Sequence, residues 1–295
     1  SGRISYRWQA PCPIAAPARV RHSWVVSKDL TSGAAGPAMQ DKLSTLSLPE
    51  ARLARILRCT ASDVLRWAGL YEQATAETDA IGFGMRRVQA EQTLLHEGQR
   101  FENVYLVGGG SFKHVQTDLE GYEQVLGFAT HGDMLGLDGL GRDRHASGAV
   151  ALEDSSVVVL PFAELLALSH RIPALERLLH RATGTELMRR ADTQYLMSAP
   201  SSEVRVARFV LQLAQRQRAL GHSDRRLRLS MTRRDIASYL GVAHETVSRA
   251  LTALVQDGCI AVSHRDIEIT DETGLRELQR MTRGRSPREG QELAA

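Results

Sequence analysis

The sequence predicts an α+β protein in which a β-rich domain, a long helix and a small basic helical domain follow one another. Three patterns indicate this order. Short runs of Val, Leu, Tyr and Phe separated by glycines fill residues 88–162, apolar residues three or four apart follow from Pro173, and a helix-turn-helix pattern occupies residues 231–258. The 295 residues suffice for about two domains with a sizeable core.

Composition excludes several classes of protein. Apolar residues make up 43% and charged residues 24% of the chain, which is typical of a folded globular protein rather than a disordered one. No apolar run approaches the roughly 18 residues that cross a bilayer, so we expect no membrane partner. Cys12, Cys59 and Cys259 lie far apart and form no C-x-x-C pair, which argues against a disulfide framework or a metal site and favours a reducing cytoplasm.

Positive charge gathers in one part of the chain. Only Lys28, Lys42 and Lys113 of the 37 basic residues are lysine, so 34 are arginine. Residues 201–249 hold ten arginines and four acidic residues, a net charge of +6 against +3 for the whole chain. Such local charge is expected of a surface that binds nucleic acid. Composition alone leaves a solvated, arginine-rich surface as the alternative.

Segment boundaries follow from the same patterns. Residues 1–45 contain four prolines and a Gly- and Ala-rich stretch, which predicts a flexible leader that need not belong to the natural protein. Helical spacing of Leu and Ile predicts a helix over residues 46–71. The predicted parts are the leader (1–45), the β-rich domain with flanking helices (46–172), the long helix (173–200), the basic helical domain (201–280) and a disordered tail (281–295).

The β-rich part is typical of an antiparallel sandwich or barrel, because short strands alternate with glycine turns. The clearest predicted strands are Val104–Val107, Ser111–Val115, Gln124–Phe128 and Ser156–Leu160. The helix that begins at Pro173 ends before Pro200, which makes it about 25 residues and about 37 Å long. An amphipathic helix of this length usually packs against a partner helix.

The helix-turn-helix pattern is the most informative feature of the sequence. Thr232 is placed to cap the first helix, with Asp235 three residues later, and Gly241 supplies the positive φ of the turn. The apolar residues predicted to face inward are Ile236, Ala237, Leu240, Val247, Leu251 and Leu254. The residues left outward near the start of the second helix are His244, Glu245, Ser248 and Arg249.

These outward residues suit the major groove of DNA. Arg249 can bind guanine O6 and N7 with two hydrogen bonds, and Glu245 can accept one from cytosine N4. Ile260–Val262 and Ile267–Ile269 predict the two strands of a wing beside the helices. A helical hairpin with a solvated outer face is the alternative.

Over about residues 88–278 the chain resembles the CRP/FNR family of bacterial transcription regulators, within it the FNR/FixK branch that lacks iron–sulfur cysteines. The resemblance rests on Gly127–Asp138, Val159–Phe162 and the Met231–Arg249 block, whose end matches the E-x-x-S-R of that branch. It implies an N-terminal β-roll like the cyclic-nucleotide-binding jelly roll, a dimerisation helix and a C-terminal winged helix-turn-helix. A member of the family is not expected to be an enzyme, and the sequence shows no P-loop, nucleophile elbow or H-E-x-x-H motif.

The resemblance also implies partners. Double-stranded DNA of the form TTGAT-N4-ATCAA would be read by a homodimer, and RNA polymerase would be contacted by an activator through a loop at Gly136–Arg142. The DNA-binding residues are then Glu245, Ser248, Arg249, His244, Thr232 and Arg233. The dimerisation residues on the long helix are Leu178, Leu187, Ala191 and Tyr195.

The signal that such a regulator senses is less well specified. An iron–sulfur cluster needs four thiolates, but only Cys59 lies near a matching place, and Val158 takes the position of the β-domain cysteine. The Arg-Ser pair that holds a cyclic nucleotide is broken. We therefore expect no cofactor, as in FixK-like members that act without a ligand.

Three alternatives stay open for sensing. The residues of a candidate effector loop are Asp133, Arg142, Arg144 and Ser147, and the last three could still meet an anion. The histidines that make haem a candidate are His96, His114, His131 and His145. Cys259, at the start of the wing, is a candidate redox site, although filling the core is the commoner role of such a cysteine. Any of these would make the protein an effector-gated regulator.

Overall fold

Two antiparallel sheets form the first half of the structure, a computed structural model that describes residues 58–118 and 120–280. The described residues all fall within one compact unit. Its elements up to the long helix are β1 (Arg58–Thr60), α3 (Ala61–Trp67), η1 (Tyr71–Gln73), α4 (Ala76–Asp79), β2 (Gly82–Val88), β3 (Thr93–Leu95), β4 (Asn103–Gly109), β5 (Ser111–Thr117), β6 (Glu123–Thr130), β7 (Met134–Leu135), η2 (Leu137–Gly141), β8 (Gly148–Ala151), β9 (Ser155–Pro161) and α5 (Phe162–Ser169).

The sheets have the strand orders β1-β2-β9-β4-β7 and β3-β8-β5-β6. One core lies between them, because Val107 and Val157 from the first sheet and Phe112 and Ala149 from the second belong to one buried cluster. The four strands predicted from the sequence are all present, as β4, β5, β6 and β9. The α+β fold class and the β-roll are thus confirmed.

Helices cover the other face of the first sheet. Alternate residues of β4 and β9, such as Leu106 and Leu160, pack there against α3, α5 and the first turns of the long helix. The helix predicted over residues 46–71 is confirmed over Ala61–Trp67 and wrong at Arg58–Thr60, which is a strand paired with β2. The helix begins only after Thr60, whose side chain and that of Asp63 form a capping box. Residues 46–57, the predicted leader and the predicted tail lie outside the described residues.

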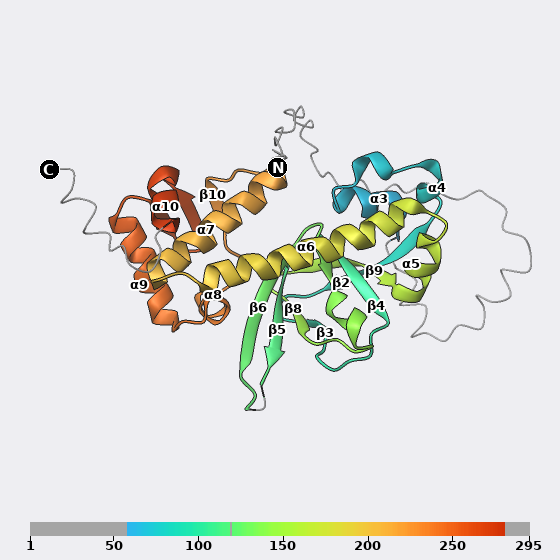
Figure 1. Ribbon diagram of the computed structural model, residues 1–295, viewed down its shortest axis with the longest axis horizontal. Helices are drawn as coiled ribbons and strands as arrows, with labels where there is room; N and C mark the ends of the chain where they lie inside the picture. The colour runs from blue at the N-terminus through green and yellow to red at the C-terminus, as the bar shows by residue number, and fades with distance from the viewer. Residues whose placement is uncertain (1–57, 119, 281–295) are drawn as a thin grey trace, which may run out of the picture. The chain divides into compact units, whose positions relative to one another are not determined.

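The second half contains the long helix and the helix-turn-helix (Figure 1). The long yellow helix α6 has Pro173 in its first turn, where a missing N–H costs nothing. No helix among the described residues is long and apolar enough to span a membrane. The elements of this half are α6 (Pro173–Met197), α7 (Ser202–Ala219), β10 (Arg226–Arg228), α8 (Arg233–Leu240), α9 (His244–Gln256), β11 (Ile260–Ser263), β12 (Asp266–Ile269) and α10 (Glu272–Gln279).

The wing is a three-stranded sheet with the order β10-β12-β11, one strand more than the sequence predicted. All six residues predicted to face inward from α8 and α9 are buried. They share a single apolar cluster with Val115, Val125 and Phe128, which come from β5 and β6. The core of the helix-turn-helix is therefore continuous with the side of the β-roll formed by β5 and β6.

Candidate DNA interface and effector region

The start and end of α8 are fixed by local chemistry. The hydroxyl of Thr232 accepts a hydrogen bond from the backbone N–H of Asp235, and the Asp235 carboxylate accepts from the backbone N–H and the hydroxyl of Thr232, at 2.9 and 2.6 Å. Gly241 ends the helix with φ +62°, a conformation that suits glycine. These two residues set the turn that leads into α9 at His244, the residue where the sequence predicts its start.

The first two turns of α9 present a row of polar side chains to solvent. His244, Glu245, Ser248 and Arg249 are all exposed, while Val247 between them is buried. The Nδ1 atom of His244 lies 3.3 Å from Oε2 of Glu245, and the hydroxyl of Ser248 donates to the carbonyl of His244. Arg249 makes no hydrogen bond or ion pair with any described residue. Its guanidinium is available to an external partner.

Two of the predicted DNA-binding residues, Thr232 and Arg233, make contacts within the chain itself. Thr232 is exposed, but its hydroxyl is engaged in the capping box. The guanidinium of Arg233 is partly buried and donates to the carbonyl of His264 in the wing, so it braces the wing against α8. Burial lowers the pKa of Arg233. The neighbouring Arg234, which sequence reasoning passed over, is the exposed cation at this end of α8.

The helix-turn-helix is also held against the β-roll. Nζ of Lys113 in β5 lies 2.8 Å from Oδ1 of Asp235. Ser238 of α8 accepts from the backbone N–H of Val125 at 2.8 Å, and its carbonyl accepts from the side-chain amide of Gln124. This ion pair and these hydrogen bonds thus hold α8 against the edge formed by β5 and β6.

The predicted dimerisation residues divide into two groups along α6. Leu178 is only 1% exposed and packs in the core of its own chain, so it is not available to a partner and its assignment is corrected. Leu187, Ala191 and Tyr195 are exposed. Met188, which the prediction left out, is exposed beside them. The exposed apolar face thus begins further along the helix than the sequence pattern indicated.

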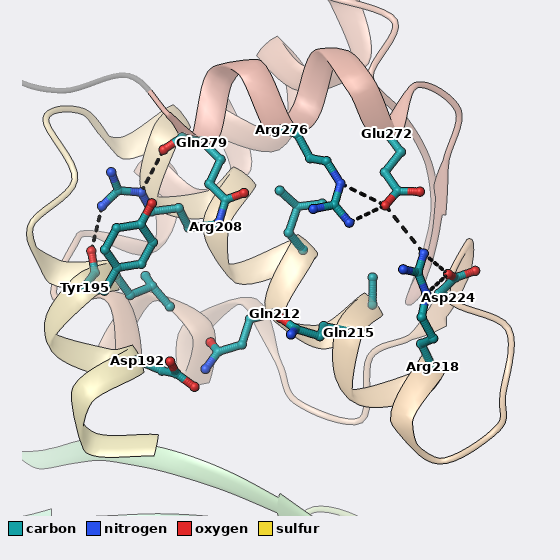
Figure 2. Close-up of a pocket in the computed structure, with 13 residues that line it drawn as sticks. Asp192, Tyr195, Arg208, Gln212, Gln215, Arg218, Asp224, Glu272, Arg276 and Gln279 are labelled. Carbon is teal, nitrogen blue, oxygen red and sulfur yellow. Dashed lines mark hydrogen bonds and ion pairs between the residues drawn. The ribbon is translucent and has the colours of Figure 1, made fainter. Parts of the chain in front are cut away.

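Tyr195, near the end of α6, contacts Arg208 of α7 (Figure 2). The guanidinium of Arg208 lies 4.1 Å from the centre of the Tyr195 ring and donates to the Tyr195 carbonyl and to that of Gln279 in α10. A cavity of about 260 Å³ lies beside this contact. Its other two arginines are paired, Arg218 with Asp224 and Glu272, and Arg276 with Glu272.

The candidate effector loop does not come together as an anion site. The backbone N–H and the hydroxyl of Ser147 both donate to the carboxylate of Asp138, at 2.7 and 2.8 Å. Asp133 pairs with Arg189 of α6. Arg142 is exposed, and exposed Arg144 donates to the carbonyl of Gly98. An acidic side chain thus occupies the donors that a phosphate would need, so these residues do not fit a cyclic nucleotide.

The histidines and cysteines do not converge either. The Nδ1 atom of His131 lies 2.9 Å from the carbonyl oxygen of Gly108, and that of His145 lies 3.4 Å from Asp138, whose charge also acts on His114. Within residues 58–118 and 120–280, no three His, Cys, Asp or Glu side chains gather closely enough to hold a metal ion.

Both described cysteines are buried and free. Burial raises the pKa of Cys59 to about 12, and burial with the nearby Asp271 and Asp257 raises that of Cys259. Because the thiolate is the reactive form, burial makes both thiols less reactive than an exposed cysteine. The third predicted cysteine, Cys12, lies outside the described residues.

Comparisons with known proteins agree with this architecture. A family model described as a Crp-like helix-turn-helix domain matches residues 204–278, and one described as a cyclic nucleotide-binding domain matches residues 85–171. The chain is 37% identical to the transcriptional regulatory protein btr of Bordetella pertussis over 65% of this chain and 79% of that protein.

A second relative is similar over almost its full length. The fumarate and nitrate reduction regulatory protein of Escherichia coli is 33% identical to this chain, and the match covers 80% of this chain and 98% of that protein. The solved structure of FixK2 from Bradyrhizobium japonicum matches with a TM-score of 0.61 and 28% identity, covering 67% of this chain and 98% of that one.

These proteins are regulators rather than enzymes, and the winged helix-turn-helix described above is the part with which such regulators bind DNA. The chain belongs to the CRP/FNR family of transcription regulators.

Proposed function

We propose that this regulator is a homodimeric activator that reads a TTGAT-N4-ATCAA-like palindrome through Glu245, Ser248 and Arg249. The observation that carries the proposal is the exposed polar row on α9, in which the guanidinium of Arg249 has no partner among the described residues. Arg249 would bind guanine with two hydrogen bonds, and Glu245 would accept one from cytosine. His244, next to Glu245, would help to orient that carboxylate.

The exposed apolar face of α6 supports the dimer. Leu187, Met188, Ala191 and Tyr195 would pack against the same residues of a second copy, because a two-fold axis pairs identical surfaces. Two α9 helices related by that axis would then meet two half-sites of a palindrome. Arg234 rather than Arg233 would contact the phosphate backbone, since Arg233 is engaged with the wing.

The contact with RNA polymerase would lie on the β-roll. In the loop at Gly136–Arg142, Leu140 is 40% exposed and Gly141 and Arg142 are exposed too, so the loop offers an apolar and a cationic group to a partner. Repression by overlap with a promoter would use the same DNA contacts and not this loop.

We place the chain with FixK-like members that work in the cytoplasm without an iron–sulfur cluster or cyclic nucleotide. The residues argue for this. The Cys59 thiol is buried with a raised pKa, Val158 has no ligand atom, and Asp138 occupies the donors of Ser147. Activity would then follow the abundance of the protein.

The test measures binding of the wild type and of two variants to a fluorescent TTGAT-N4-ATCAA duplex and to a scrambled duplex across a salt series. Arg249→Ala should lose about 1–3 kcal/mol of preference for the palindrome and keep most of its binding to scrambled DNA. Arg234→Ala should weaken binding to both duplexes alike and reduce the salt slope by about one. Equal losses on both duplexes for Arg249→Ala would contradict base reading.

A further inference from the structure

Residues 198–201 join the long helix α6 to α7, the helix that leads into the helix-turn-helix. A link of this length can turn the chain in several directions, although Pro200 fixes one φ and Ala199 is buried. The direction in which the winged helix-turn-helix leaves α6 therefore depends on side-chain contacts around the link. In a two-fold dimer, that direction also decides how far apart the two α9 helices lie.

Arg208 of α7 makes several of these contacts, and it is only 5% exposed (Figure 2). Its Nη1 atom donates to the carbonyl of Tyr195 at 2.6 Å and to the hydroxyl of Ser198 at 3.2 Å, and its Nε atom donates to the carbonyl of Gln279 at 3.2 Å. The last carbonyls of a helix lack partners within the helix and carry the negative end of its dipole. One cation thus joins the end of α6, the link and the end of α10.

Arg205, one turn earlier on α7, holds the same end of α6 and the end of α8. Its Nη1 atom donates to the carbonyl of Leu240, the last residue of α8, at 2.7 Å. Its Nη2 atom donates to the carbonyl of Met197, the last residue of α6, at 3.4 Å. Residues three apart are neighbours on a helix surface, so the two arginines act from one side of α7. The first two turns of α7 therefore hold the ends of α6, α8 and α10.

Arg208 also contacts the exposed apolar face of α6. Its guanidinium carbon lies 4.1 Å from the centre of the Tyr195 ring, and this tyrosine is 49% exposed. Leu187, Ala191 and Tyr195 follow one another at intervals of four residues, so they share the face on which we place the second copy. A second copy on this face would exclude water from the ring, and a cation–π contact is stronger where water is excluded. Arg208 therefore links the dimer face to the DNA-binding part of the chain.

We propose that Arg208 is a positioning residue that sets the spacing of the two half-sites that this regulator accepts. The inference rests on the proposed function, a homodimer that reads a palindrome. Glu245 and Arg249 would read bases from α9, whereas Arg208 is buried on α7 and acts through the angle between α6 and the helix-turn-helix. Lys113 and Asp235 hold α8 against the β-roll, and Arg208 holds the same module against α6, the helix on which the two copies would meet.

The test measures the affinity of wild type and Arg208→Met for duplexes in which three, four, five or six base pairs separate the TTGAT and ATCAA half-sites, and for a single half-site. Each added base pair rotates the second half-site by about 34°, so wild type should prefer the four-base-pair spacer at least about tenfold. Arg208→Met should reduce this preference to less than about threefold and keep its affinity for the single half-site within about twofold, because the base-reading side chains are intact. An unchanged spacer preference, or equal losses on the palindrome and on the single half-site, would overturn the proposal.

A measurement without DNA separates the positioning role from the proposed function. Spin labels at Glu176→Cys in α6 and Gln256→Cys in α9, both exposed positions, report the distance between the two helices within one chain. The labelled chain has its native cysteines replaced by alanine and is diluted with unlabelled chain. We expect a narrow distribution of distances that is lost when Arg208→Met is added. The same width in both chains would overturn the positioning role, whereas wild-type protein that does not distinguish the palindrome from scrambled DNA would overturn the proposed function alone.

Variants of Tyr195 give a second test if Arg208→Met does not fold. Tyr195→Leu keeps the exposed face apolar but removes the ring, so it should fold and lose part of the spacer preference. Tyr195→Phe keeps the ring over the guanidinium and should retain the preference. Arg218→Met is the control, because it removes an exposed arginine of the same helix that pairs with Asp224 and Glu272, and it should behave as wild type. Equal spacer preferences in Tyr195→Leu and Tyr195→Phe would then overturn the proposal.

Discussion

Lys113 of β5 and Asp235 of α8 form an ion pair, 2.8 Å from Nζ to Oδ1, that joins the β-roll to the first helix of the helix-turn-helix. Both side chains are mostly buried, at 19% and 10% exposed. The same carboxylate closes the capping box with Thr232. One acidic group thus starts α8 and also docks it.

The ion pair should contribute measurably to stability. We expect Lys113→Met and Asp235→Asn each to lower the free energy of unfolding by about 1–3 kcal/mol, because each leaves a partly buried charged group with fewer partners. The double variant should lose less than the sum. Urea unfolding of all four proteins measures this coupling. The exposed pair Arg66–Asp63 is the control, and Arg66→Met should cost less than about 1 kcal/mol. Strictly additive losses at Lys113 and Asp235 would mean that the pair contributes nothing.

The pH dependence of this contribution follows from the pKa of Asp235. Burial alone would raise that pKa, but hydrogen bonds from Lys113 and Thr232 outweigh it and hold the pKa below its ordinary value of 3.8. A carboxyl group whose pKa is lower in the folded than in the unfolded state stabilises the fold at pH values above its unfolded-state pKa. This stabilisation is lost as the pH falls through the folded-state pKa. The stability difference between wild type and Asp235→Asn should therefore stay constant from about pH 7 to about pH 5 and narrow as the pH falls towards 3.8 and below. A difference that already shrinks at pH 5 in urea titrations would contradict the depressed pKa.

Two leucines of α6 should respond in opposite ways. Leu187→Glu places a charge in the exposed apolar face and should shift the protein from dimer to monomer with little effect on the thermal unfolding of the monomer. Leu178→Ala removes a side chain buried within its own chain and should cost about 2–5 kcal/mol of stability. Light scattering and calorimetric melting distinguish the two. A Leu187→Glu protein that keeps its dimer mass would exclude this face as the interface.

The cysteines of the described residues should be inert in the native protein. In variants that retain only Cys59 or only Cys259, iodoacetamide at pH 8 should react no faster than the protein unfolds, because burial raises both pKa values. A cysteine introduced at exposed Ser263 in the wing is the control that should react at once. Fast native labelling of Cys259, followed by mass spectrometry, would restore it as a redox candidate.

The sequence predicts the helix-turn-helix closely because each of its signals is local. Thr232 and Asp235 are three residues apart, Gly241 has the positive φ that the turn requires, and the spacing of the apolar residues determines which face of α9 is buried. Arg233 and Arg234 show what such local signals do not predict. Neighbouring helical residues point about 100° apart, and only the position of the wing decides which of them is covered.

Periodicity also identifies an apolar face without saying what covers it. Nine residues separate Leu178 from Leu187, so the two lie on opposite faces of α6, and the β-roll and α5 cover the first and leave the second exposed. Strand β10 depends on its neighbour in the same way, since Leu227 is the one apolar residue among its three and its strand character comes from pairing with β12.

The apolar cluster that joins Val115, Val125 and Phe128 to the helix-turn-helix has a consequence for engineering. A fragment that begins at Ser201 would lose these three side chains and expose the surface they cover, so it should aggregate rather than serve as an isolated reader of DNA. A chimera that grafts a foreign DNA-binding module onto this β-roll must carry a matching surface for the same three residues. The modules of this chain are thus contiguous in sequence but not interchangeable as parts.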